Sequence, residues 1–96
     1  MAYLNYHHLN YFRVVAKTGH LSRAAQQLHI AQSALSSQIK QLEQQLGQAL
    51  FLRQGRRLEL TEAGRIALSY AENINAQGSE LLSLFQEGDA VTRQIL

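Results

Sequence analysis

The sequence contains no cysteine, no proline and no tryptophan. Without cysteine the chain can form neither a disulfide framework nor a thiolate metal site, and this absence fits a cytoplasmic protein. No apolar run is long enough to cross a bilayer, so a membrane partner is not expected. The N-terminus also lacks the basic and apolar segments of a signal peptide. A length of 96 residues predicts one small domain, with or without an appendage.

Acidic residues are scarce in the first two-thirds of the chain. Residues 1–65 carry eight Lys and Arg against three acidic residues, a net charge of +5. Residues 66–96 carry one Arg against four acidic residues, a net charge of −3. The overall charge of +2 therefore hides a split, in which only the front part is suited to meet a polyanion.

Residues 21–46 are the most informative segment. We expect Ser22 to cap a helix that runs through Leu28, followed by a turn over residues 29–31. A further helix then spans about Gln32 to Leu46 and ends at Gly47. Two helices joined so closely predict a helix-turn-helix, whose second helix can enter the major groove of DNA. An earlier helix is expected from the N-cap residue Asn5 to about residue 18, with Gly19 after its end.

The helix over residues 32–46 has two contrasting faces. Its apolar stripe, at three- and four-residue spacing, consists of Leu35, Ile39, Leu42 and Leu46. The other side is small and polar, and it carries no acidic residue in the first two turns. Glutamine can pair with adenine and serine with any base edge, whereas a lysine suits phosphate. The candidates for DNA contact here are Gln32, Ser33, Ser36, Ser37, Gln38 and Lys40. Taken alone, the face is equally consistent with plain solvation.

Two short apolar runs follow, around a glycine-containing turn, and they predict a β-hairpin over residues 49–60. A hairpin directly after such a helix is a wing. Its basic residues Arg53, Arg56 and Arg57 suit phosphates or a narrow minor groove.

The last predicted helix begins after Thr61, a good N-cap residue, and extends almost to Leu96. Positions 67, 70, 74, 77, 81, 84, 88, 91 and 95 alternate steps of three and four, and seven of these nine are apolar. Because so small a head cannot cover this seam, we expect a second copy of the chain to do so. The residues assigned to dimerisation are Tyr70, Ile74, Leu81, Leu84 and Val91.

No constellation for catalysis, metal binding or a cofactor is recognisable, so an enzyme is not expected. His7 and His8 are adjacent and cannot share a helical face. The sequence contains neither a glycine-rich phosphate loop nor a nucleophile elbow.

A string of residues along nearly the whole chain resembles the N-terminal part of LysR-type transcriptional regulators. It comprises Leu9, Tyr11-Phe12, Gly19, Ala24-Ala25, Leu28-His29, Gln32, Ala34-Leu35-Ser36, Gln38-Ile39, Leu42-Glu43, Leu46-Gly47, Leu50-Phe51, Arg53 and Leu60-Thr61-Glu62-Ala63-Gly64. Residues 4–9 and 69–71 look like the subgroup that includes the sodium/proton antiporter activator.

The resemblance implies a mainly α fold, with a winged helix-turn-helix over residues 1–61 and a linker or dimerisation helix over residues 62–96. It further implies a cytoplasmic, nucleoid-associated protein that binds double-stranded DNA at a dyad-symmetric operator as a homodimer. In the full-length protein it allows a tetramer and a contact with RNA polymerase. The effector-binding domain that the family carries after the linker helix is not part of these 96 residues.

The chain departs from the family pattern at three positions. It has Ser33 where proline is frequent, Ser37 where arginine is frequent, and Ala31 where Ser or Thr commonly caps the helix. The missing arginine puts one DNA contact in doubt. The alternative from another functional class is a winged-helix protein-interaction module with a helical docking rod.

Overall fold

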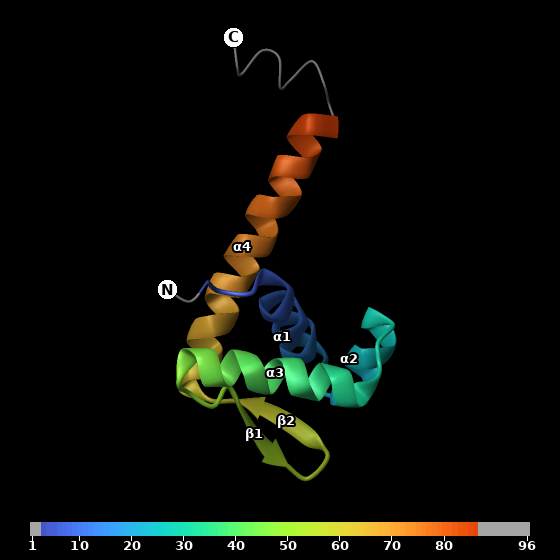
Figure 1. Ribbon diagram of the computed structural model, residues 1–96, viewed down its shortest axis with the longest axis vertical. Helices are drawn as coiled ribbons and strands as arrows, with labels where there is room; N and C mark the ends of the chain where they lie inside the picture. The colour runs from blue at the N-terminus through green and yellow to red at the C-terminus, as the bar shows by residue number, and fades with distance from the viewer. Residues whose placement is uncertain (1–2, 87–96) are drawn as a thin grey trace.

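Residues 3–86, the part of the chain that the computed structural model describes, form a compact head and a projecting helix (Figure 1). The elements in chain order are α1 (Tyr6–Thr18), α2 (Leu21–Leu28), α3 (Gln32–Leu46), β1 (Phe51–Gln54), β2 (Arg57–Leu60) and α4 (Glu62–Gln86). This order confirms the predicted winged helix-turn-helix followed by a long helix.

The core lies where α1 packs against α2, α3 and the start of α4. Its largest fully buried side chains are Phe12 and Val15 from α1, Leu35 and Leu42 from α3, and Leu50 from the following loop. Ala24 and Ala25 on α2 are buried as well, and their small side chains let the neighbouring helices approach closely. Leu46, which was expected to continue the apolar stripe of α3, is 43% exposed, so this expectation was wrong. Its side chain lines an apolar groove that is open to solvent beside Ile66 and Tyr70.

The predicted ends of α1 are confirmed. The Asn5 side chain accepts hydrogen bonds from the backbone N–H groups of His7 and His8, at 2.9 and 3.1 Å. Gly19 ends the helix in the left-handed conformation, at φ 74°, where a Cβ would be strained.

The predicted cap of α2 was wrong. The helix begins at Leu21, its N-cap is His20, and no side chain caps it, so Ser22 lies inside the first turn. The Thr18 hydroxyl donates a hydrogen bond to the His20 carbonyl at 3.2 Å, immediately before the helix begins. The turn before α3 is confirmed, with His29 at φ 57° and no side-chain cap at Ala31.

The wing is a two-stranded antiparallel hairpin in which Phe51 pairs with Leu60 and Gln54 pairs with Arg57. Gly55, at φ 63°, occupies the first position of its two-residue turn, as a short hairpin requires. The Leu58 amide donates to the Gly19 carbonyl at 3.1 Å, which ties β2 to the head.

Helix α4 begins as predicted, because the Thr61 hydroxyl accepts from the Gly64 N–H at 2.9 Å. Its first part packs on the head, with Gly64 and Ala71 buried, and its second part rises away as a rod (Figure 1). Val91 and the end of the predicted seam lie outside the described residues.

Candidate nucleic-acid interface

The polar face of α3 is open to solvent. Gln32, Ser33, Ser37 and Lys40 are exposed, and Ser36 is half-buried. On the opposite side Leu35, Ile39 and Leu42 are only 0%, 7% and 0% exposed, so the predicted inward stripe is confirmed for these three residues. The face can therefore meet a macromolecule without any rearrangement of the core.

A shallow hollow lies along this face because its middle residues are serines. It is lined by Ser33, Ser36, Ser37, Lys40, Gln41 and Gln44. Gln41 and Gln44 were absent from the candidate residues, although both are exposed and share the helical face with Ser37. Their i+4 and i+7 spacing from Ser37 was the available signal.

Gln38 differs from the other candidates on α3. Its side chain is half-buried, and its Oε1 atom is buried without a hydrogen-bond partner among residues 3–86. It therefore lies at the edge of the polar face, beside the core.

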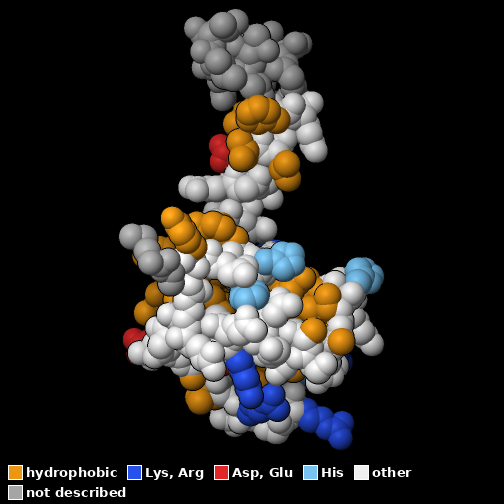
Figure 2. Space-filling view, viewed as in Figure 1, with side chains coloured by type: hydrophobic (Ala, Val, Ile, Leu, Met, Phe, Trp, Pro, Cys, Tyr) orange, Lys and Arg blue, Asp and Glu red, His pale blue; other side chains and the backbone are white. Residues whose placement is uncertain are grey.

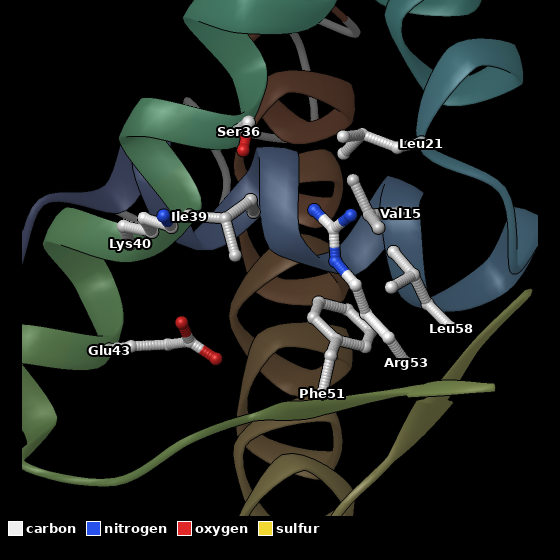
Figure 3. Close-up of a pocket in the computed structure, with 9 residues that line it drawn as sticks. All are labelled: Val15, Leu21, Ser36, Ile39, Lys40, Glu43, Phe51, Arg53 and Leu58. Carbon is white, nitrogen blue, oxygen red and sulfur yellow. The ribbon is translucent and has the colours of Figure 1, made fainter. Parts of the chain in front are cut away.

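The wing lies below α3 in the view of Figure 1, and in the same view Figure 2 shows Lys and Arg side chains gathered at this end of the head. Arg53, Arg56 and Arg57 are all exposed. The Arg53 side chain extends from β1 across a cavity of about 100 Å³ towards Ser36 on α3 (Figure 3). Lys40 borders the same cavity. The structure thus brings one basic side chain of α3 together with one of the wing.

Two basic residues of the front part are engaged elsewhere. Within residues 3–86, Glu72 of α4 forms ion pairs with Lys17 at 3.2 Å and with Arg13 at 3.8 Å. Arg13 also donates two hydrogen bonds to the Asn10 side chain. These contacts join α1 to α4 and were not predicted, because the partners are 55 or more residues apart.

Apolar side chains remain exposed along α4, as Figure 2 shows on the rod. Tyr70 is 66% exposed and Leu81 is 56% exposed, whereas Ile74 and Leu84 are half-buried. Leu82 and Phe85, which were not predicted, are 63% and 64% exposed. An apolar groove of about 400 Å³ runs beside Tyr70, and Leu46 lines it together with Ile66.

In the part of the chain that is described, no three or more His, Asp or Glu side chains come together as a metal site would require. Among the same residues, no helix combines the length and apolar character needed to span a membrane.

Comparison with known proteins places this geometry in a family. The model of the bacterial regulatory helix-turn-helix proteins of the lysR family matches residues 6–65. The HTH-type transcriptional regulator CatR of Pseudomonas putida is 60% identical over 58 residues, which cover 60% of this chain and 20% of that protein. The RuBisCO operon transcriptional regulator of Allochromatium vinosum is 38% identical over 85 residues, which cover 88% of this chain and 28% of that protein. The transcriptional activator protein NhaR of Escherichia coli is 37% identical over 84 residues, which cover 88% of this chain and 28% of that protein. The chain thus spans between a fifth and a third of the length of these relatives.

Solved structures agree with the sequence matches. A DNA complex of the BenM DNA-binding domain at benA site 1 superposes with a TM-score of 0.80 and 32% identity, over 86% of this chain and 96% of that one. The complex of the CbnR DNA-binding domain with DNA superposes with a TM-score of 0.79 and 32% identity, over 88% of this chain and 98% of that one. A full-length OxyR variant from Pseudomonas aeruginosa superposes with a TM-score of 0.82 and 30% identity, over 90% of this chain and 29% of that one.

Proposed function

The chain belongs to the LysR family of bacterial regulatory helix-turn-helix proteins, and from that premise we propose that it binds double-stranded DNA sequence-specifically to control transcription. The observation that carries the proposal is the solvent-open polar face of α3 beside a basic wing. A surface of this kind offers hydrogen-bond donors and acceptors to base edges and positive charge to phosphates.

In the proposed complex α3 lies in the major groove and reads bases through its N-terminal half. Gln32 pairs with an adenine edge, and Ser33, Ser36 and Ser37 contact base edges or phosphates at close range. Lys40 contacts phosphate, and Gln38 lies at the edge of the interface. No residue of the polar face up to Lys40 is acidic, so nothing there repels the backbone.

The wing supplies affinity that does not depend on sequence. Arg53, Arg56 and Arg57 are proposed to contact phosphates or the adjacent minor groove. Arg53 extends towards α3, which suits a phosphate lying between the two elements (Figure 3).

We propose that two copies of the chain pair through α4. The exposed apolar side chains of Tyr70 and Leu81, with Ile74 and Leu84 beside them, need a cover that the head of the same chain does not provide. A two-fold dimer would present two α3 helices to successive major grooves, so the operator is expected to be a dyad-symmetric pair of half-sites. Residues 1–61 and 62–96 are the proposed binding and linker segments.

For the full-length protein we propose a cytoplasmic, nucleoid-associated transcriptional regulator that can form a tetramer and contact RNA polymerase. The proposal follows from the family and from the fraction of its relatives that the chain covers.

Selection from a pool of random duplexes tests the proposal. The chain is expected to enrich two related half-sites and to shift the enriched duplex in a gel more strongly than a shuffled one. A chain that shifts neither duplex, or that shifts both equally, contradicts sequence-specific binding. The first result would favour a role in protein interaction instead.

A further inference from the structure

Leu50 lies at the junction of three elements that the proposed function needs. It follows α3, precedes β1, and its side chain is only 1% exposed. Its backbone N–H donates a hydrogen bond to the Oε2 atom of Glu43 at 2.7 Å. Its carbonyl oxygen accepts from the Thr61 N–H at 3.0 Å, at the start of α4. One residue therefore connects α3, the wing and α4.

Glu43 is the only acidic residue of α3. It is half-buried, and its carboxylate extends from the helix into the space between α3 and the strands (Figure 3). It borders the same cavity as Lys40 and Arg53. A carboxylate beside a surface that binds phosphates opposes binding through Coulomb repulsion. The hydrogen bond that the Glu43 carboxylate accepts from Leu50 is a structural contribution that can offset this repulsion.

Several contacts fix the wing to the head, among them the packing of Phe51 on Phe12 and two hydrogen bonds. The Glu43 carboxylate holds the backbone that leads into β1, and the Gly19 carbonyl holds β2 through the Leu58 amide at 3.1 Å. Arg53 lies on β1, three residues after Leu50 and directly opposite Leu58, so both hydrogen bonds are close to it. The bond between Glu43 and Leu50 joins a side chain of α3 to the backbone just before β1. Charge assistance makes it stronger than a neutral hydrogen bond.

We propose that Glu43 is a positioning residue for DNA binding. It holds the wing at the distance from α3 at which Arg53 and Lys40 reach the same stretch of phosphates. This inference rests on the proposed function. It assigns Glu43 no contact with DNA, and its effect passes through the wing.

A pair of uncharged variants separates the hydrogen bond from the charge. Glu43→Gln and Glu43→Met both remove the negative charge at similar side-chain length, but only glutamine keeps an oxygen that can accept from Leu50. Affinity is measured on the duplex that the wild-type chain enriches from a random pool. We expect Glu43→Met to bind about threefold to tenfold more weakly than Glu43→Gln, the factor that loss of one hydrogen bond gives. We also expect Glu43→Met to have a shallower salt dependence, because the wing arginines leave the phosphates.

Glu59→Gln serves as the matched control. Glu59 is exposed on β2, so its substitution changes the charge near the wing without touching the anchor. It is expected to bind as tightly as wild type or more tightly. If Glu43→Gln and Glu43→Met instead bind alike, and both at least as tightly as Glu59→Gln, Glu43 acts only through its charge and the proposal is overturned. Failure of the wild-type chain to bind the duplex would refute the proposed function itself.

A comparison of the wild-type chain with Glu43→Gln covers the case in which Glu43→Met does not fold. In NMR spectra the Leu50 amide proton resonance is expected to move when its carboxylate acceptor becomes an amide. The Leu58 amide, which bonds a backbone carbonyl, is expected to stay unchanged. A Leu50 resonance that is the same in both chains would overturn the proposal.

Discussion

At the scale of single residues, the proposed interface divides its work between neutral and charged side chains. Gln32 and the serines of α3 can distinguish base edges, whereas Lys40 and the wing arginines bear charge that every duplex attracts. This division predicts different consequences for substitutions on α3 and on the wing.

Arg53→Ala is expected to weaken binding to all duplexes by a similar factor, because a phosphate contact carries no sequence information. Gln32→Ala is expected to change the preference at one base pair, worth about 1–3 kcal/mol of discrimination for a bidentate pair. Affinities on a panel of single-base variants of the enriched duplex measure both effects. Identical profiles for the two variants would refute the assignment of roles.

Two glycines of α4 are predicted to respond in opposite directions to alanine. A Cβ at Gly64 would overlap the Leu50 carbonyl oxygen and lie 2.9 Å from Leu60 Cδ2, so Gly64→Ala should lower the free energy of unfolding by about 1–3 kcal/mol. At Gly78 a Cβ meets nothing within 4 Å, so Gly78→Ala should raise it by roughly 1 kcal/mol through helix propensity. Urea denaturation at one fixed protein concentration tests the pair. Equal effects would contradict the close packing of α4 on Leu50.

Helix ends were predicted correctly where a single residue supplies what the backbone requires there, either a capping side chain or a left-handed glycine. Asn5 and Thr61 cap their helices as predicted, and Gly19 and Gly47 end theirs. The predicted cap at Ser22 was wrong because α2 begins at Leu21, with His20 in extended conformation as its N-cap and no side-chain cap, which a propensity rule does not predict. The role of Glu43 was missed because its partner is a backbone amide seven positions away across a loop.

At the scale of elements, the helical period, the capping residues and the glycine-containing turn between two apolar runs were enough to predict the helices and the wing, but not their mutual packing. The stripe of Leu35, Ile39 and Leu42 defined the inner face of α3, since the helical period fixes which residues share a side. The contact of α4 with α1 through Glu72 was not predictable, because it depends on where a distant helix crosses. The burial of Leu46 was predicted wrongly for the same reason. Helical periodicity shows that Leu46 shares the apolar face of α3, but not whether a neighbouring element covers it.

Helix α4 supports a prediction about pairing. Leu81→Asp is expected to weaken the dimer at least about tenfold, because it places a carboxylate in an apolar seam. Ser83→Asp is the control, since this exposed serine lies on another side of the same helix. Sedimentation equilibrium measures the dissociation constants. A dimer weakened equally by both variants, or by neither, would argue against the proposed seam.

At the scale of the whole molecule, the wing and the projecting part of α4 lie at opposite ends of the head (Figure 1). On the face that Figure 2 shows, Lys and Arg side chains gather at the wing end, and apolar side chains are exposed on the rod as well as on the head. Such an arrangement lets one end meet a polyanion while the other pairs with a second copy. The difference in net charge between the two parts of the chain was evident from the sequence. The ion pairs of Arg13 and Lys17 with Glu72 were not.

Pairing of two heads sets an upper limit on the salt dependence of binding. A dimer presents two copies each of Lys40, Arg53, Arg56 and Arg57. If all of them met phosphates, the slope of log K against log salt would approach about −7. Titration of binding with potassium chloride gives the slope. A slope near zero would remove the electrostatic part of the proposed complex.

The claim on which the account depends is that the polar face of α3 is the surface that meets DNA. Titration of the isotope-labelled chain with the enriched duplex, followed by NMR of the backbone amides, tests it most directly. The account predicts the largest changes over residues 32–40 and 53–57, with smaller changes on the outer part of α4. Changes confined to α4, with the amides of residues 32–40 unmoved at saturation, would contradict it.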